Sequence, residues 1–300
     1  MRRRRLLLAV AALISAAPAA QDRSVRDAPR FRSRVEVVSL TTTVRDAEGR
    51  LVTNLPQDAF EVYEDGNRQA IAQFTRARVP ISLGVLLDVS DSMYGQRIED
   101  ARGVVKRFLF DLLDPADEFF VLAFNHAPHF LTGWTRTPAV VHRALEEARP
   151  FGGTAFYDAL LTSLPLIETR SESRTALLLI SDGADTASDA TLRDVRSALL
   201  RSDAFVYAIA ISPPESQPIN TEVNPAALRE ITDASGGRTE IVHHTADLVA
   251  ATSSIAEELN HQYVLGYYSP HGPDGKYHAI RVRLRSPGYR VRARSGYVAE

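Results

Sequence analysis

A cluster of small oxygen-bearing side chains follows one of the most apolar stretches of the sequence. The segment Ile81–Ser92 reads ISLGVLLDVSDS, so an apolar run ends at Asp88 and is followed by Ser90 and Ser92. Carboxylate and hydroxyl oxygens are the ligands that hard divalent cations take from proteins. Serines also cap helices, and a helical pattern begins near Arg97. The two serines alone leave a cation site and a helix cap as open alternatives.

Two other segments carry similar side chains at comparable places. In FGGTAFYDAL, Thr154 stands just before an expected helix, and in LLLISDGAD, Asp182 stands just after an expected strand. In an open α/β sheet, ligands bind beyond the carboxyl ends of the strands, where neighbouring loops diverge. We therefore expect both residues to reach the edge of the sheet at which Asp88 lies.

The elements that would position these residues alternate between strands and helices. Apolar runs cover Ile81–Leu87, Phe119–Phe124, Ala176–Ile180, Phe205–Ile211 and the shorter Thr239–Val242. Helical patterns cover Arg97–Leu113, Thr137–Ala148, Phe156–Ile167, Ala190–Arg201 and Ala246–Asn260. Continuous apolar strands with crossover helices are typical of a parallel sheet that is covered on both faces. The sequence predicts an α/β domain with a doubly wound, mostly parallel sheet over residues 80–261.

Both flanks of this region show the alternating pattern of β-strands. Residues 33–77 contain the turn signals DAEG and EDGN, and residues 262–300 contain PDGK and SPG. A short hairpin segment rarely stands alone in water. We expect the two flanks to pair into one small β domain, with the α/β domain inserted between them.

The three segments around Asp88, Thr154 and Asp182 resemble the von Willebrand factor type A (VWFA) family and its metal-ion-dependent adhesion site (MIDAS). The family's D-x-S-x-S pattern matches Asp88, Ser90 and Ser92. Its threonine matches Thr154, and its second aspartate matches Asp182. Three separated elements in an α/β context favour the cation site over the helix cap.

The resemblance implies a Rossmann-like fold and a divalent cation held by these five residues, Mg²⁺ first, with Mn²⁺ or Ca²⁺ as alternatives. It also implies a protein partner whose carboxylate completes the coordination of the cation. The flanks, including VYEDGNRQ and YVLGYYSP, are similar to those of secreted bacterial VWFA-related proteins, a group without a defined biochemical role. In related adhesive domains the last helix shifts when ligand binds, so a similar shift here would reach the following strand.

Other polar residues near the site allow less specific interpretations. Asp91, Asp158 and Asp185 could orient the ligands, but each is interpreted first as a helix cap or a solvated charge. Histidines that lack a completing ligand set are predicted to be surface residues: His126, His129, His243 and His244. A hydrolase would need a base or nucleophile beside the cation, and the sequence has neither a G-x-S-x-G elbow nor a phosphate loop. We expect a binding protein rather than an enzyme, with a structural or assembly protein of the cell envelope as the alternative.

Composition excludes several classes of protein. Of 300 residues, 45% are apolar and 24% charged, which indicates a globular protein with a sizeable core. The formal net charge of -2 does not suggest nucleic-acid binding. The chain has no cysteine, which rules out disulfides and thiolate metal sites.

The N-terminus and the last strands address location and further partners. Residues 1–20 have a basic start, a short apolar stretch and an A-x-A pattern, which predicts a signal peptide. The stretch is shorter than a membrane span, so no transmembrane anchor is expected and the protein should be exported to the periplasm, cell surface or medium. Arginines alternate along the last strands and are expected to form basic faces: Arg281, Arg283 and Arg285, then Arg290, Arg292 and Arg294. Such a face could bind anionic envelope polymer, or it could be solvated and paired with neighbouring acidic side chains.

Overall fold

The largest sheet of the protein has the predicted doubly wound arrangement. The computed structural model describes residues 37–182, 185–211 and 225–300. Its six-stranded sheet has the order β10-β9-β8-β5-β6-β7. The strands are β5 (Ile81–Asp88), β6 (Glu118–Phe124), β7 (Pro128–Thr135), β8 (Arg174–Ser181), β9 (Phe205–Ile211) and β10 (Thr239–Val242). All neighbouring strands are parallel except β6 and β7. The predicted α/β fold class, with a mostly parallel sheet, is confirmed.

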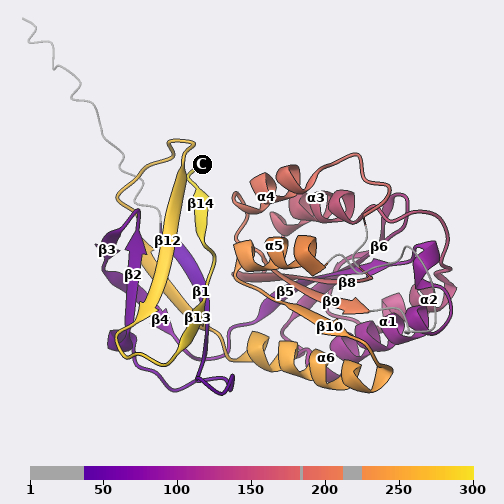
Figure 1. The fold of residues 1–300 in the computed structure, drawn as a ribbon, viewed down its shortest axis with the longest axis horizontal. Coiled ribbons are helices and arrows are strands. Elements are labelled where there is room, and N and C mark those ends of the chain that lie inside the picture. The colour runs from indigo at the N-terminus through magenta and orange to yellow at the C-terminus, as the bar shows by residue number, and fades with distance from the viewer. Residues whose placement is uncertain (1–36, 183–184, 212–224) are drawn as a thin grey trace, which may run out of the picture. The chain divides into compact units, whose positions relative to one another are not determined.

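Helices cover both faces of this sheet (Figure 1). On one face lie α1 (Gln96–Arg107), α2 (Ala139–Glu147) and α6 (Thr245–Asn260), and α1 continues into a π-helical turn over Phe108–Leu112. On the other face lie α3 (Phe156–Ile167), α4 (Leu192–Leu199) and α5 (Pro225–Ser235). Side chains of β5 divide between the two layers, since Val85 packs toward α1 and Leu86 toward α3. A strand that is buried on both faces explains the continuous apolar run in the sequence.

The strands of the two flanks form two four-stranded antiparallel sheets with the orders β13-β1-β11-β4 and β14-β12-β2-β3. The N-terminal strands are β1 (Val37–Arg45), β2 (Phe60–Glu64), β3 (Asn67–Gln69) and β4 (Ile71–Thr75). The C-terminal strands are β11 (Tyr263–Tyr268), β12 (Tyr277–Leu284), β13 (Arg290–Arg292) and β14 (Gly296–Val298). β1 pairs with β11 and β2 with β12, so each sheet contains strands from both ends of the chain. The two sheets share one apolar core that includes Leu40, Phe60, Leu265 and Ile280.

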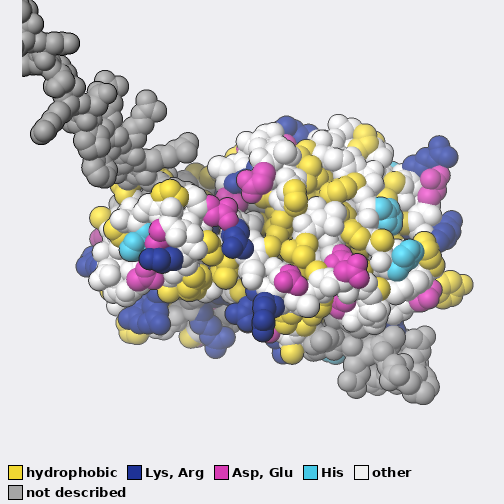
Figure 2. Space-filling view, turned by 90° about the horizontal axis from the view of Figure 1, so that it is seen from above, with side chains coloured by type: hydrophobic (Ala, Val, Ile, Leu, Met, Phe, Trp, Pro, Cys, Tyr) yellow, Lys and Arg dark blue, Asp and Glu magenta, His cyan; other side chains and the backbone are white. Residues whose placement is uncertain are grey.

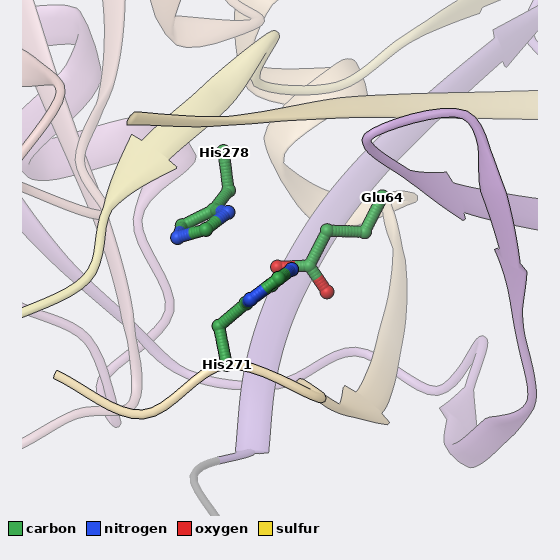
Figure 3. Close-up of side chains that lie close together, drawn as sticks. All are labelled: Glu64, His271 and His278. Carbon is green, nitrogen blue, oxygen red and sulfur yellow. The ribbon is translucent and has the colours of Figure 1, made fainter. Parts of the chain in front are cut away.

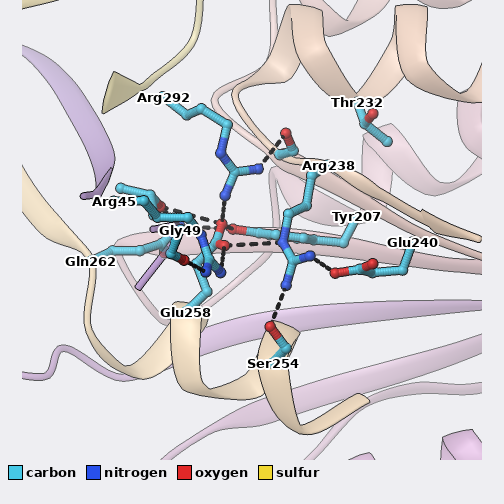
Figure 4. A network of polar contacts seen from close by, with 12 residues as sticks. Arg45, Gly49, Tyr207, Thr232, Arg238, Glu240, Ser254, Glu258, Gln262 and Arg292 are labelled. Carbon is cyan, nitrogen blue, oxygen red and sulfur yellow. Dashed lines mark hydrogen bonds and ion pairs between the residues drawn. The ribbon is translucent and has the colours of Figure 1, made fainter. Parts of the chain in front are cut away.

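One buried carboxylate connects the last helix of the α/β part to the flanking strands (Figure 4). Glu258 of α6 is fully buried and accepts hydrogen bonds from Arg45 Nη2 at 3.0 Å and Arg238 Nε at 3.1 Å. It also contacts the guanidinium of Arg292 and the hydroxyl of Tyr207. Burial raises the pKa of Glu258, but Arg292 and then Arg238 outweigh burial and hold this pKa below its usual value.

The arginines of the last strands form a smaller basic face than predicted. Arg281 and Arg283 of β12, and Arg285 directly after it, are exposed, as expected from the alternation. Arg292 instead contacts buried Glu258, and the guanidinium of Arg294 lies over the Tyr297 ring at 5.4 Å from its centroid. β13 pairs with β1 rather than β12, so Arg290 belongs to a different sheet. The prediction that Arg290, Arg292 and Arg294 share one solvated face is wrong, because β13 ends at Arg292 and this side chain has a buried partner.

The predicted signal peptide, residues 1–20, lies outside the described residues, as do residues 33–36 of the N-terminal β segment. Within residues 37–182, 185–211 and 225–300, none of the helices combines the length and apolar character needed to cross a membrane.

Candidate metal centre

The predicted site residues lie at the carboxyl end of the central sheet. β5 ends at Asp88, and its parallel neighbour β8 ends at Ser181, directly before Asp182. β5 lies between β8 and β6, where the order of strands reverses direction. Open α/β sheets bind ligands at this kind of position. We call the loops after β5 and β8, together with the loop before α3, the crest.

Asp88 is fully buried, and both of its carboxylate oxygens are hydrogen-bonded. The backbone N–H of Ser90 donates to Oδ1 at 2.8 Å, and the hydroxyl of Ser181 donates to Oδ2 at 2.5 Å. Burial, and then the negative charge of Asp182, raise the pKa of Asp88 to about 7, against the lowering effect of these hydrogen bonds. Asp182 is also fully buried. The crest thus holds two buried carboxylates that repel each other.

The two serines contact each other rather than cap a helix. Their hydroxyl oxygens, Oγ of Ser90 and Oγ of Ser92, lie 3.0 Å apart. α1 begins after Gly95, whose positive φ of 79° suits glycine, and no side chain caps this helix. Ser90 precedes the short 3-10 turn Asp91–Met93, also without a side-chain cap. The helix-cap alternative is therefore wrong for both serines, because the chain turns once more before α1 starts.

Thr154 is buried in the loop before α3, and backbone hydrogen bonds tie this loop to the other two. The carbonyl oxygen of Gly152 accepts from the backbone N–H of Asp91 at 2.9 Å. The backbone N–H of Thr154 donates to Oγ1 of Thr186 at 2.9 Å, and its carbonyl accepts from the N–H of Thr186 at 2.8 Å. The three segments that carry the five predicted residues are thus joined at one place.

Arg97, in the first turn of α1, contacts the site and was not predicted. Its Nη1 donates to the carbonyl oxygen of Ser92 at 2.6 Å and lies 3.3 Å from Oδ2 of Asp182. The side chain is only 7% exposed, so this ion pair is poorly screened by water. Arg97 therefore holds the serine loop and offsets part of the negative charge of Asp182.

The donor set of the crest fits a hard divalent cation. The two carboxylates and the hydroxyls of Ser90 and Ser92 are gathered at one place, and the backbone of Thr154 is tied to the same loops. Burial makes the repulsion between the carboxylates costly, and a cation would relieve it. Oxygen donors without imidazole or thiolate favour Mg²⁺, Mn²⁺ or Ca²⁺ over softer metals. The residues that would hold the cation are Asp88, Ser90, Ser92, Thr154 and Asp182.

The neighbouring aspartates mainly brace the loops. Asp185 Oδ2 accepts from the backbone N–H of Tyr157 at 3.0 Å, and Asp158 accepts from the N–H groups of Asp189 and Ala190 at 3.0 Å each. Asp91 is exposed. Asp158 and Asp185 are half-buried and brace loops, so neither is the solvated charge that was one of the two interpretations, and neither stands at the N-cap position of α3.

Two large aromatic side chains are exposed beside the site. Tyr94, two residues after Ser92, is 80% exposed, and Phe151, three residues before Thr154, is 54% exposed. The ring of His126, an exposed histidine after β6, lies 5.5 Å from that of Phe151. Exposed aromatic groups of this kind often mark protein-binding surfaces.

The region that carries the site matches a known domain family. Residues 83–184 match the family model described as von Willebrand factor type A domain. The chain contains a von Willebrand factor type A domain. The match runs from β5 to just beyond Asp182, so it includes all five residues of the predicted site. A comparison with curated proteins found no match to the chain.

Several solved structures share the fold of the type A domain. A von Willebrand factor type A protein from Catenulispora acidiphila is 14% identical, with a TM-score of 0.53, and covers 90% of this chain and 75% of its own. BatB, a conserved hypothetical protein from Bacteroides thetaiotaomicron, is 20% identical, with a TM-score of 0.50, over 59% of this chain and 98% of its own. The mussel byssus protein PTMP1, solved with a zinc-occupied MIDAS motif, is 14% identical, with a TM-score of 0.52, over 65% of this chain and 49% of its own. At these identities the likeness concerns the fold alone.

Proposed function

We propose that this protein is an exported, metal-dependent binding module whose type A domain captures an acidic side chain of a partner protein. The observation that carries the proposal is the meeting of two buried carboxylates with the Ser90 and Ser92 hydroxyls at the crest. A bound divalent cation would supply a positive centre that attracts a carboxylate from outside. Two of the five side chains are charged, so the cation keeps electrophilic character toward a further anion.

The residues around the cation have separate tasks in this proposal. Ser181 and the backbone of Ser90 fix the orientation of the Asp88 carboxylate. Arg97 fixes the serine loop through the Ser92 carbonyl. Residues that orient metal ligands in this way commonly change the affinity for the metal by about 10–100-fold when they are removed.

The identity of the cation is proposed from its ligands. The crest offers oxygen atoms, which favour Mg²⁺ first and Mn²⁺ or Ca²⁺ next. The mussel byssus protein PTMP1 holds zinc in its MIDAS motif, so zinc belongs among the competing ions. We therefore propose Mg²⁺, with the other cations as competitors in the same assay.

The exposed aromatic residues support a partner protein rather than a purely structural cation. Tyr94 and Phe151 expose large apolar side chains beside a charged site. Protein interfaces commonly combine buried aromatic side chains of this kind with a few polar contacts. A cation that only stiffened the crest would not require them. The alternative, an assembly protein of the cell envelope, would use the flanking sheets for pairing and retain its interactions without the cation.

We propose binding rather than catalysis. His126, an exposed histidine, lies close to Gly152 and Phe151 of the crest. An enzyme that used His126 as a base would lose turnover in a His126→Ala variant, whereas a binding module would keep its affinity for cation and partner.

Export and the basic face of β12 are further parts of the proposal. The charged start and short apolar stretch of residues 1–20 support export to the periplasm, cell surface or medium. Arg281, Arg283 and Arg285 are the arginines that remain for anionic envelope polymer, although Arg285 Nε lies 3.6 Å from Glu61. Figure 2 shows basic and acidic side chains interspersed over one face of the described chain. We therefore rank polymer binding below protein binding.

The test measures cation binding first and carboxylate capture second. Calorimetric titration with Mg²⁺ should give one site in the wild type and none in Asp88→Ala, while Asp91→Ala, an exposed aspartate of the same loop, should bind normally. Immobilised peptides with a central Asp should then retain the wild type only when Mg²⁺ is present, and the same peptides with Asn should not.

Variants of the aromatic pair separate partner from cation. Tyr94→Ala and Phe151→Ala should weaken retention on the peptides about tenfold or more and leave the affinity for Mg²⁺ unchanged. Retention that persists in a chelator, or that is equal for Asp and Asn peptides, would contradict the proposal and favour the assembly alternative.

A further inference from the structure

A second group of metal-ligating side chains lies in the flanking sheets, away from the crest in sequence. Glu64 ends β2, His271 follows β11, and His278 lies in β12. One ligand atom from each lies within 4.8 Å of the other two. Figure 3 shows the two imidazoles lying beside each other and close to the Glu64 carboxylate. Glu64 and His278 are buried and His271 is half-buried, so the group is enclosed but reachable from one side.

The Glu64 carboxylate is held at one oxygen and left without a partner at the other. Oε1 accepts from the hydroxyls of Tyr297 at 2.8 Å and Ser269 at 3.0 Å. Oε2 is buried and has no hydrogen-bond partner with ordinary geometry among the described residues, and neither has the hydroxyl of Tyr267. Burial, then the Glu64 charge and a hydrogen bond to Glu64, raise the pKa of Tyr267, so the Tyr267 hydroxyl is the neutral neighbour of this carboxylate. A buried carboxylate oxygen that has at best one neutral neighbour is costly, and a bound cation would reduce that cost.

Two further carboxylates surround the histidines. Oδ2 of Asp65 lies 2.8 Å from Nδ1 of His278 and 3.5 Å from Nε2 of His271, so these two nitrogens face one oxygen. Oδ1 of Asp274 lies 3.2 Å from Nε2 of His278. Histidines that ligate metals usually donate their other N–H to a carboxylate, which fixes the ring. Asp274 can act as this outer partner of His278 through Nε2, whereas Nδ1 is hydrogen-bonded to Oδ2 of Asp65, so a metal bound at Nδ1 has to replace that contact.

The position of Asp65 is built into the fold. Its backbone N–H donates to the carbonyl of Ala279 at 2.9 Å, and its Oδ1 accepts from the N–H of Ala279 at 2.8 Å. The residue has a positive φ of 48° in the turn between β2 and β3. A non-glycine residue in this region costs free energy, which the two hydrogen bonds to β12 offset.

The charge of the group also favours a cation. Glu64, Asp65 and Asp274 bring three carboxylates to two imidazoles. Lys276 approaches Asp274 only at 3.8 Å from an exposed position. The guanidinium of Arg294 lies over the ring of Tyr297, whose hydroxyl donates to Glu64. Neutral imidazoles with carboxylates are ligands of Zn²⁺ and related transition metals, whereas Mg²⁺ prefers oxygen alone.

We propose that Glu64, His271 and His278 bind a divalent transition metal ion, Zn²⁺ foremost, with Asp65 beside the metal and Asp274 orienting His278. The site is independent of the crest and does not rest on the proposed function of the type A domain. It would tie β2, β12 and the loop after β11 together. The rings of His271 and His278 are stacked, with centroids 4.0 Å apart and planes 19° apart, so their lone pairs do not converge in this state. Binding therefore requires His271 to rotate, which its half-exposed place in a loop permits.

The experiment titrates Zn²⁺ into the full-length Asp88→Ala protein, in which the crest lacks a ligand. One Zn²⁺ should bind per chain, and His271→Ala in the same background should weaken binding at least about 100-fold. Co²⁺ in place of Zn²⁺ should give the intense visible absorption of a tetrahedral site, since octahedral oxygen sites absorb weakly. The Ser90→Ala/Ser92→Ala protein serves as a second background should Asp88→Ala fail to fold.

The matched control is the double variant His243→Ala/His244→Ala, which removes two exposed neighbouring histidines and should leave Zn²⁺ binding unchanged. Glu64→Gln should abolish the Co²⁺ absorption, and His271→Ala decides the question alone if that variant does not fold. Absence of Zn²⁺ binding in the Asp88→Ala protein, or binding that His271→Ala does not weaken, would overturn the proposal. The group would then be an ion-pair cluster of His278 with Asp65 and Asp274.

Discussion

At the scale of single residues, the crest depends on groups that do not themselves belong to the predicted ligand set. The Asp88 carboxylate would rotate if only one of its oxygens were held. Ser181 holds the second oxygen at 2.5 Å, from the neighbouring strand. This hydroxyl therefore contributes to cation affinity through the orientation of Asp88 rather than through contact with the cation.

We predict that Ser181→Ala weakens Mg²⁺ binding about 10–100-fold while the protein stays folded, because the change removes one donor and no apolar contact of size. Calorimetric titration measures the affinity. Ser163→Ala is the matched control, since Ser163 is also buried but donates to the carbonyl of Leu160 within α3. Equal affinity for Mg²⁺ in the Ser181 and Ser163 variants would rule out the orienting role.

The residue types of the site and their places at strand ends could be predicted from the sequence. Asp88 and Asp182 follow apolar strands, so parallel pairing alone brings them to one edge. Arg97 could not be predicted, because its contact with Asp182 depends on how α1 leaves the crest after Gly95. The contact between Arg292 and Glu258 could not be predicted either. Alternation along a strand indicates on which face of the sheet a side chain lies, but not which residue it contacts.

At the scale of elements, β5 is the strand whose packing fixes the crest. It is buried along its whole length, and Gly84 faces the helix layer that contains α3. A Cβ at Gly84 would overlap the ring of Phe120 and a methyl group of Leu177. The glycine is thus required for close packing between neighbouring strands.

Gly84→Ala should destabilise the protein by about 1–3 kcal/mol, because the overlap forces neighbouring side chains out of their rotamers. The control is Gly103→Ala on α1, where a Cβ would meet nothing within 4 Å. This second change should stabilise the protein by about 0.4–1 kcal/mol. Denaturant unfolding measures both values, and a Gly84→Ala protein as stable as wild type would show that the core around β5 can adjust.

The elements predicted from the sequence are those with strong apolar periodicity. Two elements were missed, β7 and α5. β7 lies at the sheet edge, and its sequence PHFLTGWT is half-buried or exposed along its whole length, so it lacks the apolar run of its neighbours. α5 begins at Pro225 and contains few large apolar residues, although Leu228 and Ile231 pack against the sheet. Amphipathic elements with such short apolar stripes give weak signals in a single sequence.

Glu258 holds the end of α6 through its ion pairs, so its contribution to stability should depend on pH. Glu258→Gln should destabilise the protein by about 3–5 kcal/mol near neutral pH, because Arg238 and Arg292 lose their buried counter-charge. Glu257→Gln, the exposed neighbour on the same helix, should change stability by less than about 0.5 kcal/mol.

The pH dependence follows from the lowered pKa of Glu258. A lowered pKa in the folded state contributes stability that is present above the unfolded value of 4.5 and is lost as the pH falls through the folded pKa. The difference between wild type and Glu258→Gln should therefore shrink as the pH falls below 4.5. Unfolding curves between neutral and acidic pH test this, and a difference that stays constant over that range would show that Glu258 acts through packing alone.

At the scale of the whole molecule, stability and cation binding at the crest oppose each other. Burial of the Asp88 carboxylate, and then its repulsion by Asp182, destabilise the cation-free protein, as the raised pKa of Asp88, about 7, indicates. The same two charges would create the affinity for the cation. A site that lowers the stability of the protein without its ligand gains stability when the ligand binds.

Asp88→Asn separates the two effects, because the amide can still accept from the Ser90 backbone and donate to the Ser181 hydroxyl. In chelator, the variant should unfold at a higher temperature than wild type, with a gain in stability on the order of a few kcal/mol, because it no longer buries a charge at residue 88 and no longer repels Asp182. With Mg²⁺ at about 100 times its dissociation constant, wild type should gain about 2.7 kcal/mol and the variant nothing. Thermal unfolding of both proteins in chelator and in Mg²⁺ measures whether the order of their stabilities changes. If Asp88→Asn were less stable than wild type in chelator, the carboxylates would not repel as the structure indicates, and if both proteins gained equally from Mg²⁺, the cation would bind elsewhere.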